Sequence, residues 1–166
     1  MEFEKIYSTY FNDVFRYICK LSNNEHIAEE ITAETFFKAM QSIDRFRGDC
    51  DIRVWLCQIA KNNYLSYLKK SNRLDKIQDS DLLILPDLNG TTEEQVVQRD
   101  EAIQFQKLLH DIPNPYKEVF MWRVFAELNF KQIGQIFNNS ENWACVTYHR
   151  ARNKIKEAAE VSKHEK

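Results

Sequence analysis

Apolar side chains recur at three- and four-residue steps along residues 1–70, and this spacing predicts three amphipathic helices. The first would place its apolar side chains at Phe3, Ile6, Tyr7, Tyr10, Phe11, Val14, Phe15 and Ile18. Asn24 can cap a second helix, whose apolar face would carry Ile27, Ile31, Phe36, Ala39, Met40 and Ile43. Gly48 interrupts the pattern, and a third helix is expected from about Ile52 to Lys70.

Residues 71–95 lose this periodicity. They contain Pro86 and the pair Asn89-Gly90, which are residue types of turns and loops. They also carry much of the acidic excess of the chain. We therefore expect a helical domain over residues 1–72, a flexible acidic linker over 73–95 and a second helical domain over 96–166.

The periodicity returns in the last part of the chain and predicts a helix-turn-helix motif. Helices are expected near residues 96–111, 116–127, 131–137 and 141–159. Pro113 and Pro115 separate the first two of these helices. A short helix, the polar turn at residues 138–140 and a longer basic helix are the order that such a motif requires.

The final helix has two distinct faces. Its buried face should carry Ala144, Tyr148, Ala151, Ile155 and Ala158, which repeat at steps of four and three. The opposite face carries Asn142, Val146, His149, Arg150, Asn153 and Lys156, with Arg152 and Lys154 beside it. Ser140 can cap the helix, so its electropositive first turn also faces outward. A solvated surface would explain these charges equally well by themselves, but the preceding helix and turn favour DNA binding.

Composition narrows the fold class to all-α. The chain has 166 residues, of which 43% are hydrophobic and 29% charged, with only three glycines and three prolines.

Its formal net charge of −2 conceals an uneven distribution. Residues 1–70 hold 10 acidic and 10 basic side chains, residues 71–101 hold 8 and 3, and residues 102–166 hold 7 and 10. Such asymmetry is typical of nucleic-acid-binding proteins.

Neither a metal site nor a membrane span is indicated. The four cysteines form no CxxC pair, and the histidines make no HExxH or ExxH spacing, which favours reduced thiols over a metal centre. No apolar run approaches the ~20 residues of a transmembrane helix. The first residues lack the order of a signal peptide, so a cytoplasmic protein without a metal or other cofactor is expected.

Three stretches together resemble the extracytoplasmic-function sigma factors of bacterial RNA polymerase. AEEITAETFFKAMQSIDRFRG, residues 28–48, resembles the polymerase-binding helix of that family and the loop that follows it. WLCQIAKNNYLSYLKK, residues 55–70, resembles its promoter-melting helix. IPNPYKEVFMWRVFAELNFKQIGQIFNNSENWACVTYHRARNKI, residues 112–155, resembles the helix-turn-helix that binds the upstream promoter element. Their order and spacing carry the resemblance.

The resemblance implies three groups of binding residues and no catalysis. The polymerase-binding group would be Glu29, Glu30, Glu34, Thr35, Phe37 and Lys38. The group for the melted minus-10 element would be Arg45, Arg47, Asp49, Arg53, Lys61, Asn62, Tyr64, Lys69 and Lys70, with Trp55 and Tyr67 expected in the core. The group for the minus-35 duplex would be Lys131, Asn142, Trp143, Val146, His149, Arg150, Arg152, Asn153 and Lys154. The recognition helix departs from the usual family pattern at Asn142, Trp143, Cys145 and Thr147.

The implied partners are core RNA polymerase, through its clamp and flap, and promoter DNA, with no small-molecule substrate. The family commonly works under an anti-sigma factor, and a membrane-anchored inhibitor would recruit the protein to the membrane indirectly. Two other functions stay open. One is a dimeric helix-turn-helix regulator with an effector domain at residues 1–70. The other is a helical-bundle metalloenzyme using His26, Glu30 and Glu34, although the missing ExxH spacing counts against it.

Overall fold

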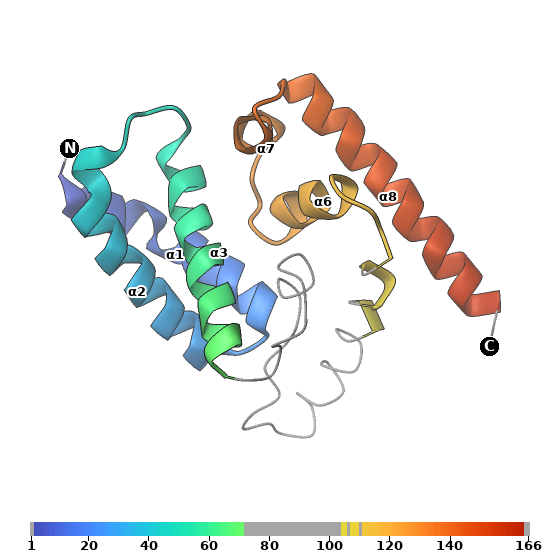
Figure 1. The fold of residues 1–166 in the computed structure, drawn as a ribbon, viewed down its shortest axis with the longest axis horizontal. Helices are drawn as coiled ribbons and strands as arrows, with labels where there is room; N and C mark the ends of the chain where they lie inside the picture. The colour runs from blue at the N-terminus through green and yellow to red at the C-terminus, as the bar shows by residue number, and fades with distance from the viewer. Residues whose placement is uncertain (1, 72–103, 106, 110, 165–166) are drawn as a thin grey trace. The chain divides into compact units, whose positions relative to one another are not determined.

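A computed structural model describes residues 2–71, 104–105, 107–109 and 111–164 of the chain, and all regular structure within these ranges is helical (Figure 1). The chain divides into two compact units, Met1–Asp87 and Leu88–Lys166, which are considered separately. The predicted linker at 73–95, both predicted domain limits and most of the helix expected near 96–111 lie outside the described residues. No helix within the described ranges is long and apolar enough to cross a bilayer.

The described part of the first unit, residues 2–71, contains three α-helices: α1 (Phe3–Ser22), α2 (Glu25–Ser42) and α3 (Ile52–Lys70). The single-turn helix η1 (Ile43–Arg45) follows α2, and all three long helices contact one another. Their shared core is formed by Val14, Ile18, Leu21, Ala28, Ile31, Phe36, Val54, Leu56, Ala60, Tyr64 and Leu68. The three predicted helices are therefore confirmed, and α3 has the predicted bounds.

Local signals define the connections between these helices. The side-chain oxygen of Asn24 accepts a hydrogen bond from the backbone N–H of Ile27 at 3.1 Å, which confirms the predicted cap of α2. Asn23, just before it, adopts φ 54°, a left-handed conformation that ends α1. Gly48 has φ +78°, so the break between η1 and α3 uses the conformational freedom of glycine.

The second unit contains the helix-turn-helix motif. Its elements are the helical residues 104–105 and 107–109, α6 (Tyr116–Val124), α7 (Phe130–Phe137) and α8 (Glu141–His164). α8 packs against both α6 and α7. Asn129 and Gln132 form a capping box at the start of α7, and the Ser140 hydroxyl accepts from the N–H of Trp143 at 3.0 Å. The predicted motif and the Ser140 cap are thus confirmed, and α8 continues past its predicted end near Ala159.

A close backbone approach fixes the turn between α7 and α8. Gly134 is buried in α7, and its carbonyl oxygen accepts from the N–H of Asn139 at 2.9 Å. A Cβ atom at position 134 would lie 2.7 Å from the carbonyl oxygen of Asn139 and 3.0 Å from that of Ser140. Both neighbours are backbone atoms of the turn, which cannot rotate aside as a side chain can. Glycine at this position therefore sets where α8 begins.

We expect Gly134→Ala to destabilise the second unit by about 1–3 kcal/mol, the usual cost of forcing an extra methyl group into a closely packed site. Urea unfolding of the full chain, followed by tryptophan fluorescence, would measure the change. Lys131→Ala, an exposed substitution in the same helix, is the control and should stay within about 0.5 kcal/mol of the parent. Equal stability of the Gly134→Ala variant and its parent would contradict the close approach.

Candidate functional site

An acidic and apolar surface covers the outer side of α2. We call it the α2 surface, and its members are Glu29, Glu30, Glu34, Phe37 and Met40, which are all exposed. Phe37 and Met40 expose 58% and 51% of their area, which is high for large apolar residues. The prediction that Met40 belongs to the buried face is wrong. The buried face runs through Ala28, Thr32, Thr35 and Ala39, and Met40 lies about 100° around the helix from Ala39.

Aromatic side chains of α1 extend this surface. Phe36 of α2 contacts three of them, with ring centroids 6.3 Å from Phe3, 5.1 Å from Tyr7 and 5.9 Å from Phe11. Tyr7, one of the residues of the predicted apolar pattern, is 45% exposed. α1 buries Ile6, Val14, Tyr17 and Ile18 most deeply, and the aromatic row at steps of four lies at the edge of that face. Helical periodicity does not reveal this edge, because Tyr7 fits the period as well as Ile6 does.

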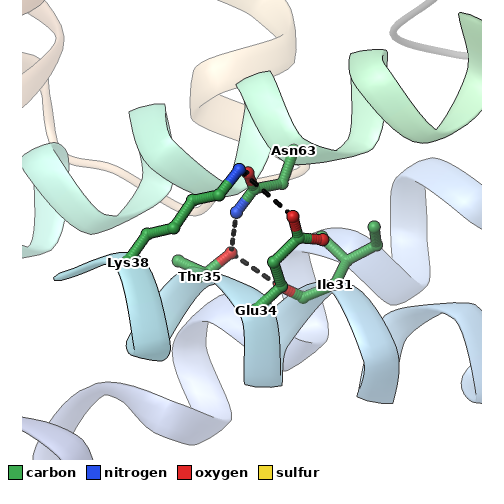
Figure 2. A network of polar contacts seen from close by, with 5 residues as sticks. All are labelled: Ile31, Glu34, Thr35, Lys38 and Asn63. Carbon is green, nitrogen blue, oxygen red and sulfur yellow. Dashed lines mark hydrogen bonds and ion pairs between the residues drawn. The ribbon is translucent and has the colours of Figure 1, made fainter. Parts of the chain in front are cut away.

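A polar network connects α2 to α3 beneath the α2 surface (Figure 2). The Nδ2 group of Asn63 donates to the Thr35 hydroxyl at 3.1 Å, and this hydroxyl donates to the Ile31 carbonyl at 2.7 Å. The Asn63 Oδ1 atom accepts from the Lys38 ammonium at 2.6 Å, and this ammonium pairs with Glu34 at 3.1 Å. Thr35 is completely buried. Its predicted place among the polymerase-contacting residues is therefore wrong, because its side chain already bridges two helices of the core.

The connection between α2 and α3 presents charge around an aromatic pair. Arg45, Arg47 and Asp49 are exposed there. The rings of Phe46 and Trp55 lie 5.0 Å apart, and both side chains are only half-buried. The expectation that Trp55 lies in the core is thus not met, and Phe46 was absent from the predicted set. Phe46 stands between Arg45 and Arg47 in the sequence, and Trp55 follows the loop in the first turn of α3. This placement of aromatic residues beside charges is the signal that could have identified them.

The remaining minus-10 candidates differ in accessibility. Asn62, Lys69 and Lys70 are exposed and Lys61 is half-buried. Arg53 is half-buried, and its Nε atom lies 3.8 Å from the carboxylate of Asp13 in α1. Tyr64 is completely buried, so its predicted DNA contact is wrong. It is one turn from each of the buried residues Ala60 and Leu68, and it therefore belongs to the inner stripe of α3, whereas Tyr67 is half-exposed.

The outward face of α8 has the predicted composition. Asn142, Val146, His149, Arg150, Arg152, Asn153 and Lys156 are exposed, whereas Ala144, Thr147 and Ala151 are buried against the rest of the unit. We call these exposed residues the α8 face. Thr147, one of the departures from the family pattern, thus belongs to the core. Lys131, another minus-35 candidate, is exposed on α7.

Three candidates near this face make contacts within the unit. Trp143 is half-buried, and its ring lies 5.3 Å from that of Phe137. His149 lies 6.4 Å from the ring of Phe130 and stays exposed. The ammonium of Lys154 lies 5.0 Å from the centre of the Tyr116 ring in α6. A cation above an aromatic face is attracted by the ring, so Lys154 is directed toward α6 and away from the α8 face.

The second unit also contains a groove that the sequence did not indicate. It has a volume of about 840 Å³ and lies between the helical residues that precede Asp111 and the C-terminal half of α8. Its apolar lining comes from Leu108, Ile112, Pro113, Ala158 and Val161, with Lys107, Lys154, Asp111 and Glu157 among the charged residues around it. Val161 is 57% exposed.

The cysteines are free thiols in the described structure. Burial raises the pKa of Cys57, in the core of the first unit, to about 12. Burial also raises the pKa of Cys19 and of Cys50, with nearby carboxylates adding to the effect.

Within the described ranges no three His, Cys, Asp or Glu side chains are grouped as a metal ion requires. Of the candidates for the metalloenzyme alternative, His26 lies 3.5 Å from Glu30, and Glu34 pairs with Lys38.

Three described helices with an acidic outer surface on α2, followed along the chain by a helix-turn-helix with a basic outward face, agree with the comparisons with known proteins. The family model of Sigma-70 region 2 matches residues 6–74. The ECF RNA polymerase sigma factor SigM of Bacillus subtilis is 30% identical over 162 residues, which cover 94% of each chain. The chain therefore belongs to the extracytoplasmic-function (ECF) family of RNA polymerase sigma factors, which are transcription initiation factors.

Other relatives support the same assignment. The RNA polymerase sigma factor YlaC of Bacillus subtilis is 27% identical over 168 residues, covering 98% of this chain and 94% of that protein. Two solved structures share the fold. The first, CnrH in complex with the cytosolic domain of CnrY, has a TM-score of 0.61 at 16% identity and covers 96% of this chain and 88% of that one. The second, the sigma factor RpoE in complex with the anti-sigma factor NepR from Bartonella quintana, has a TM-score of 0.56 at 22% identity, covering 96% and 97%.

We expect Cys57 to resist alkylation in the folded protein at about pH 8.5, because the thiolate is the reactive form and burial disfavours it. Mass spectrometry after iodoacetamide treatment should find Cys57 modified only when urea is added. The raised pKa belongs to the folded state, so the free energy of unfolding should fall as the pH rises above the ordinary thiol value of 9.0 toward about 12. Modification of Cys57 as fast as that of half-exposed Cys145 would show that the site is accessible.

Proposed function

We propose that this sigma factor docks on the clamp of core RNA polymerase through the α2 surface and reads promoter DNA with two other surfaces. The loop before α3 and the outer side of α3 would hold the melted minus-10 element. The α8 face would enter the major groove of the minus-35 element, with residues 73–95 connecting the two domains. The observation that supports this proposal most strongly is the face of α8, because an exposed basic helix in a helix-turn-helix is the usual form of a major-groove reader.

Clamp docking is supported by the combination of apolar and acidic side chains on α2. Phe37 and Met40 supply exposed apolar area in the first unit, and large aromatic anchors commonly dominate the energy of an interface. Glu29, Glu30 and Glu34 surround them with negative charge. A basic helical partner would be attracted by these carboxylates and would bury the two apolar residues, so charge would steer the encounter and burial would hold the complex.

Replacing Phe37 by Ser or Glu30 by Lys should therefore weaken binding to core RNA polymerase, by about tenfold or more for Phe37→Ser, because a central aromatic anchor is worth at least about 2 kcal/mol. Fluorescence anisotropy of the labelled full chain with core polymerase would measure the affinity. Glu127→Lys makes the same charge change at an exposed position between α6 and α7 and is the matched control. If Phe37→Ser and Glu127→Lys bound equally well, the α2 surface would not be the docking site.

Contact with the melted minus-10 strand is supported by the aromatic pair beside the charged loop. Phe46 and Trp55 are both partly exposed, with Arg45 and Arg47 close in sequence. An unstacked base can stack on an aromatic ring with a gain of about 1–3 kcal/mol, while nearby cations bind the backbone. Asn62, Lys69 and Lys70 on α3 would continue the contact along the strand.

Recognition of the minus-35 duplex is supported by the division of the α8 face along its length. Asn142 and Val146 lie in the first turns, next to the end capped by Ser140, where base edges come within reach of a helix in the major groove. An amide can pair with adenine, and a valine can pack against the methyl group of thymine. Arg150, Arg152 and Lys156 lie farther along the helix, and we assign them to phosphates.

Val146→Ser and Arg150→Ala should then have different effects on promoter binding. Val146→Ser should change the preferred base at a single upstream position and leave the salt dependence unchanged. Arg150→Ala should weaken all promoters alike and reduce the slope of log affinity against log salt by about one, because one phosphate contact is lost. Binding of the holoenzyme to a promoter library at several salt concentrations would separate the two. If Arg150→Ala changed the base preference and Val146→Ser did not, the assignment of Val146 to bases and of Arg150 to phosphates would be wrong.

Control by an anti-sigma factor is the remaining part of the proposal. Both similar structures are complexes, one with the cytosolic domain of CnrY and one with the anti-sigma factor NepR. In this chain, the exposed apolar side chains of the α2 surface offer such an inhibitor a site that would exclude polymerase.

The groove beside Val161 is an apolar contact site on the second unit. We assign this groove to the polymerase flap. An inhibitor anchored in the membrane would keep this protein at the cytoplasmic side.

A further inference from the structure

Asn63 is a polar residue in a position where most neighbours are apolar. Its side chain is 3% exposed, and it faces α2 from the middle of α3. A buried amide without partners costs free energy, so its hydrogen bonds decide whether it can be accommodated. Both ends of the amide are used, with Thr35 on one side and Lys38 on the other. Asn63 therefore connects α2 and α3 by two hydrogen bonds.

The chemistry of the partners fixes the orientation of this amide. The Lys38 ammonium can only donate, so the amide oxygen must face it. The Thr35 hydroxyl donates its hydrogen to the Ile31 carbonyl, so its oxygen is left to accept from the amide Nδ2 group. Donation therefore runs in one direction from Lys38 through Asn63 and Thr35 to the backbone of α2 (Figure 2). Exchange of the amide oxygen and nitrogen would break both contacts.

The network extends from the core to the α2 surface through Lys38. The ammonium lies 2.6 Å from the buried oxygen of Asn63 and 3.1 Å from the carboxylate of Glu34, whose side chain is 48% exposed. Lys38 is the single Lys or Arg within the sequence of α2. A lysine side chain held at both points loses its usual rotamer freedom. Glu34 is consequently paired with a cation that is itself 49% exposed but is anchored by the buried oxygen of Asn63.

We propose that Asn63 is a positioning residue for polymerase binding: it fixes Lys38, which in turn fixes the Glu34 carboxylate in the conformation that meets the partner. The inference rests on the proposed function of the α2 surface. A carboxylate that is already ordered loses less conformational entropy on binding than one that must be ordered by its partner. Asn63 thus acts on the interface through two other side chains without touching the partner.

Asn63→Leu keeps a similar volume and removes both hydrogen bonds, and it should weaken binding to core RNA polymerase about fivefold. In a Glu34→Gln background the same substitution should change the affinity less than about twofold, because the carboxylate that it positions is gone. Asn63→Asp keeps an acceptor for Lys38 and loses the donor to Thr35. It should therefore lower the free energy of unfolding while polymerase affinity stays near that of the parent chain.

The affinities would be measured by anisotropy on full-length variants, with urea unfolding and circular dichroism in parallel. If Leu is not accommodated, Asn63→Ala removes the same hydrogen bonds without adding bulk. The inference would be overturned if Asn63→Leu reduced the polymerase affinity equally in the parent and in the Glu34→Gln background. It would also be overturned if Asn63→Asp lost polymerase affinity in proportion to its loss of free energy of unfolding. Phe37→Ser separates the two proposals. If it weakens binding and Asn63→Leu does not, only the positioning role is wrong; if neither does, the docking surface itself is wrong.

Discussion

Most hydrogen-bonding groups that a helix buries find a partner inside the protein, and this tendency shapes how α2 and α3 meet in the first unit. Buried hydroxyls can use the backbone of their own helix, as Ser22 and Thr35 do with carbonyls one turn earlier. The Asn63 amide of α3 is satisfied by the neighbouring helix instead, because its hydrogen bonds go to Thr35 and Lys38 of α2. Packing that separated α2 from α3, or rotated one against the other, would leave this amide unsatisfied.

The same inner face determines what α2 presents on its outside. Small and hydroxyl-bearing residues at Ala28, Thr32, Thr35 and Ala39 allow close approach to the neighbouring helices. With these positions inside, Phe37 and Met40 are left outside together with the glutamates. α8 follows the same rule, since burial of Ala144, Thr147 and Ala151 directs Asn142, Val146 and Arg150 outward. In both helices small residues occupy part of the buried face, and larger side chains on the other side provide the candidate interface.

The sequence predicted the helices and their ends better than it predicted which side chains are accessible. Local chemistry determines an end such as the Asn24 cap or the Ser140 cap, and that chemistry can be read from a few adjacent residues. The errors at Thr35 and Tyr64 have a different origin. A helix packed against two neighbours buries a wider sector than one amphipathic stripe, so residues beside the stripe enter the core. The bonds of Asn63 join residues 25 and 28 positions apart in the chain, and no local pattern encodes them.

Charge on the first unit separates two kinds of partner. α2 is acidic, whereas the last turn of α3 carries the basic residues Lys69 and Lys70. A polyanion such as DNA is repelled by the first surface and attracted by the second, and a basic protein surface shows the opposite preference. Lys38 is the single Lys or Arg of α2. A mobile ammonium among the glutamates would weaken the difference in charge between the two surfaces. The contacts of Lys38 with Asn63 and Glu34 place the positive charge at the edge of α2 that faces α3. There it offsets one carboxylate of the α2 surface, and Glu29 and Glu30 keep that surface acidic.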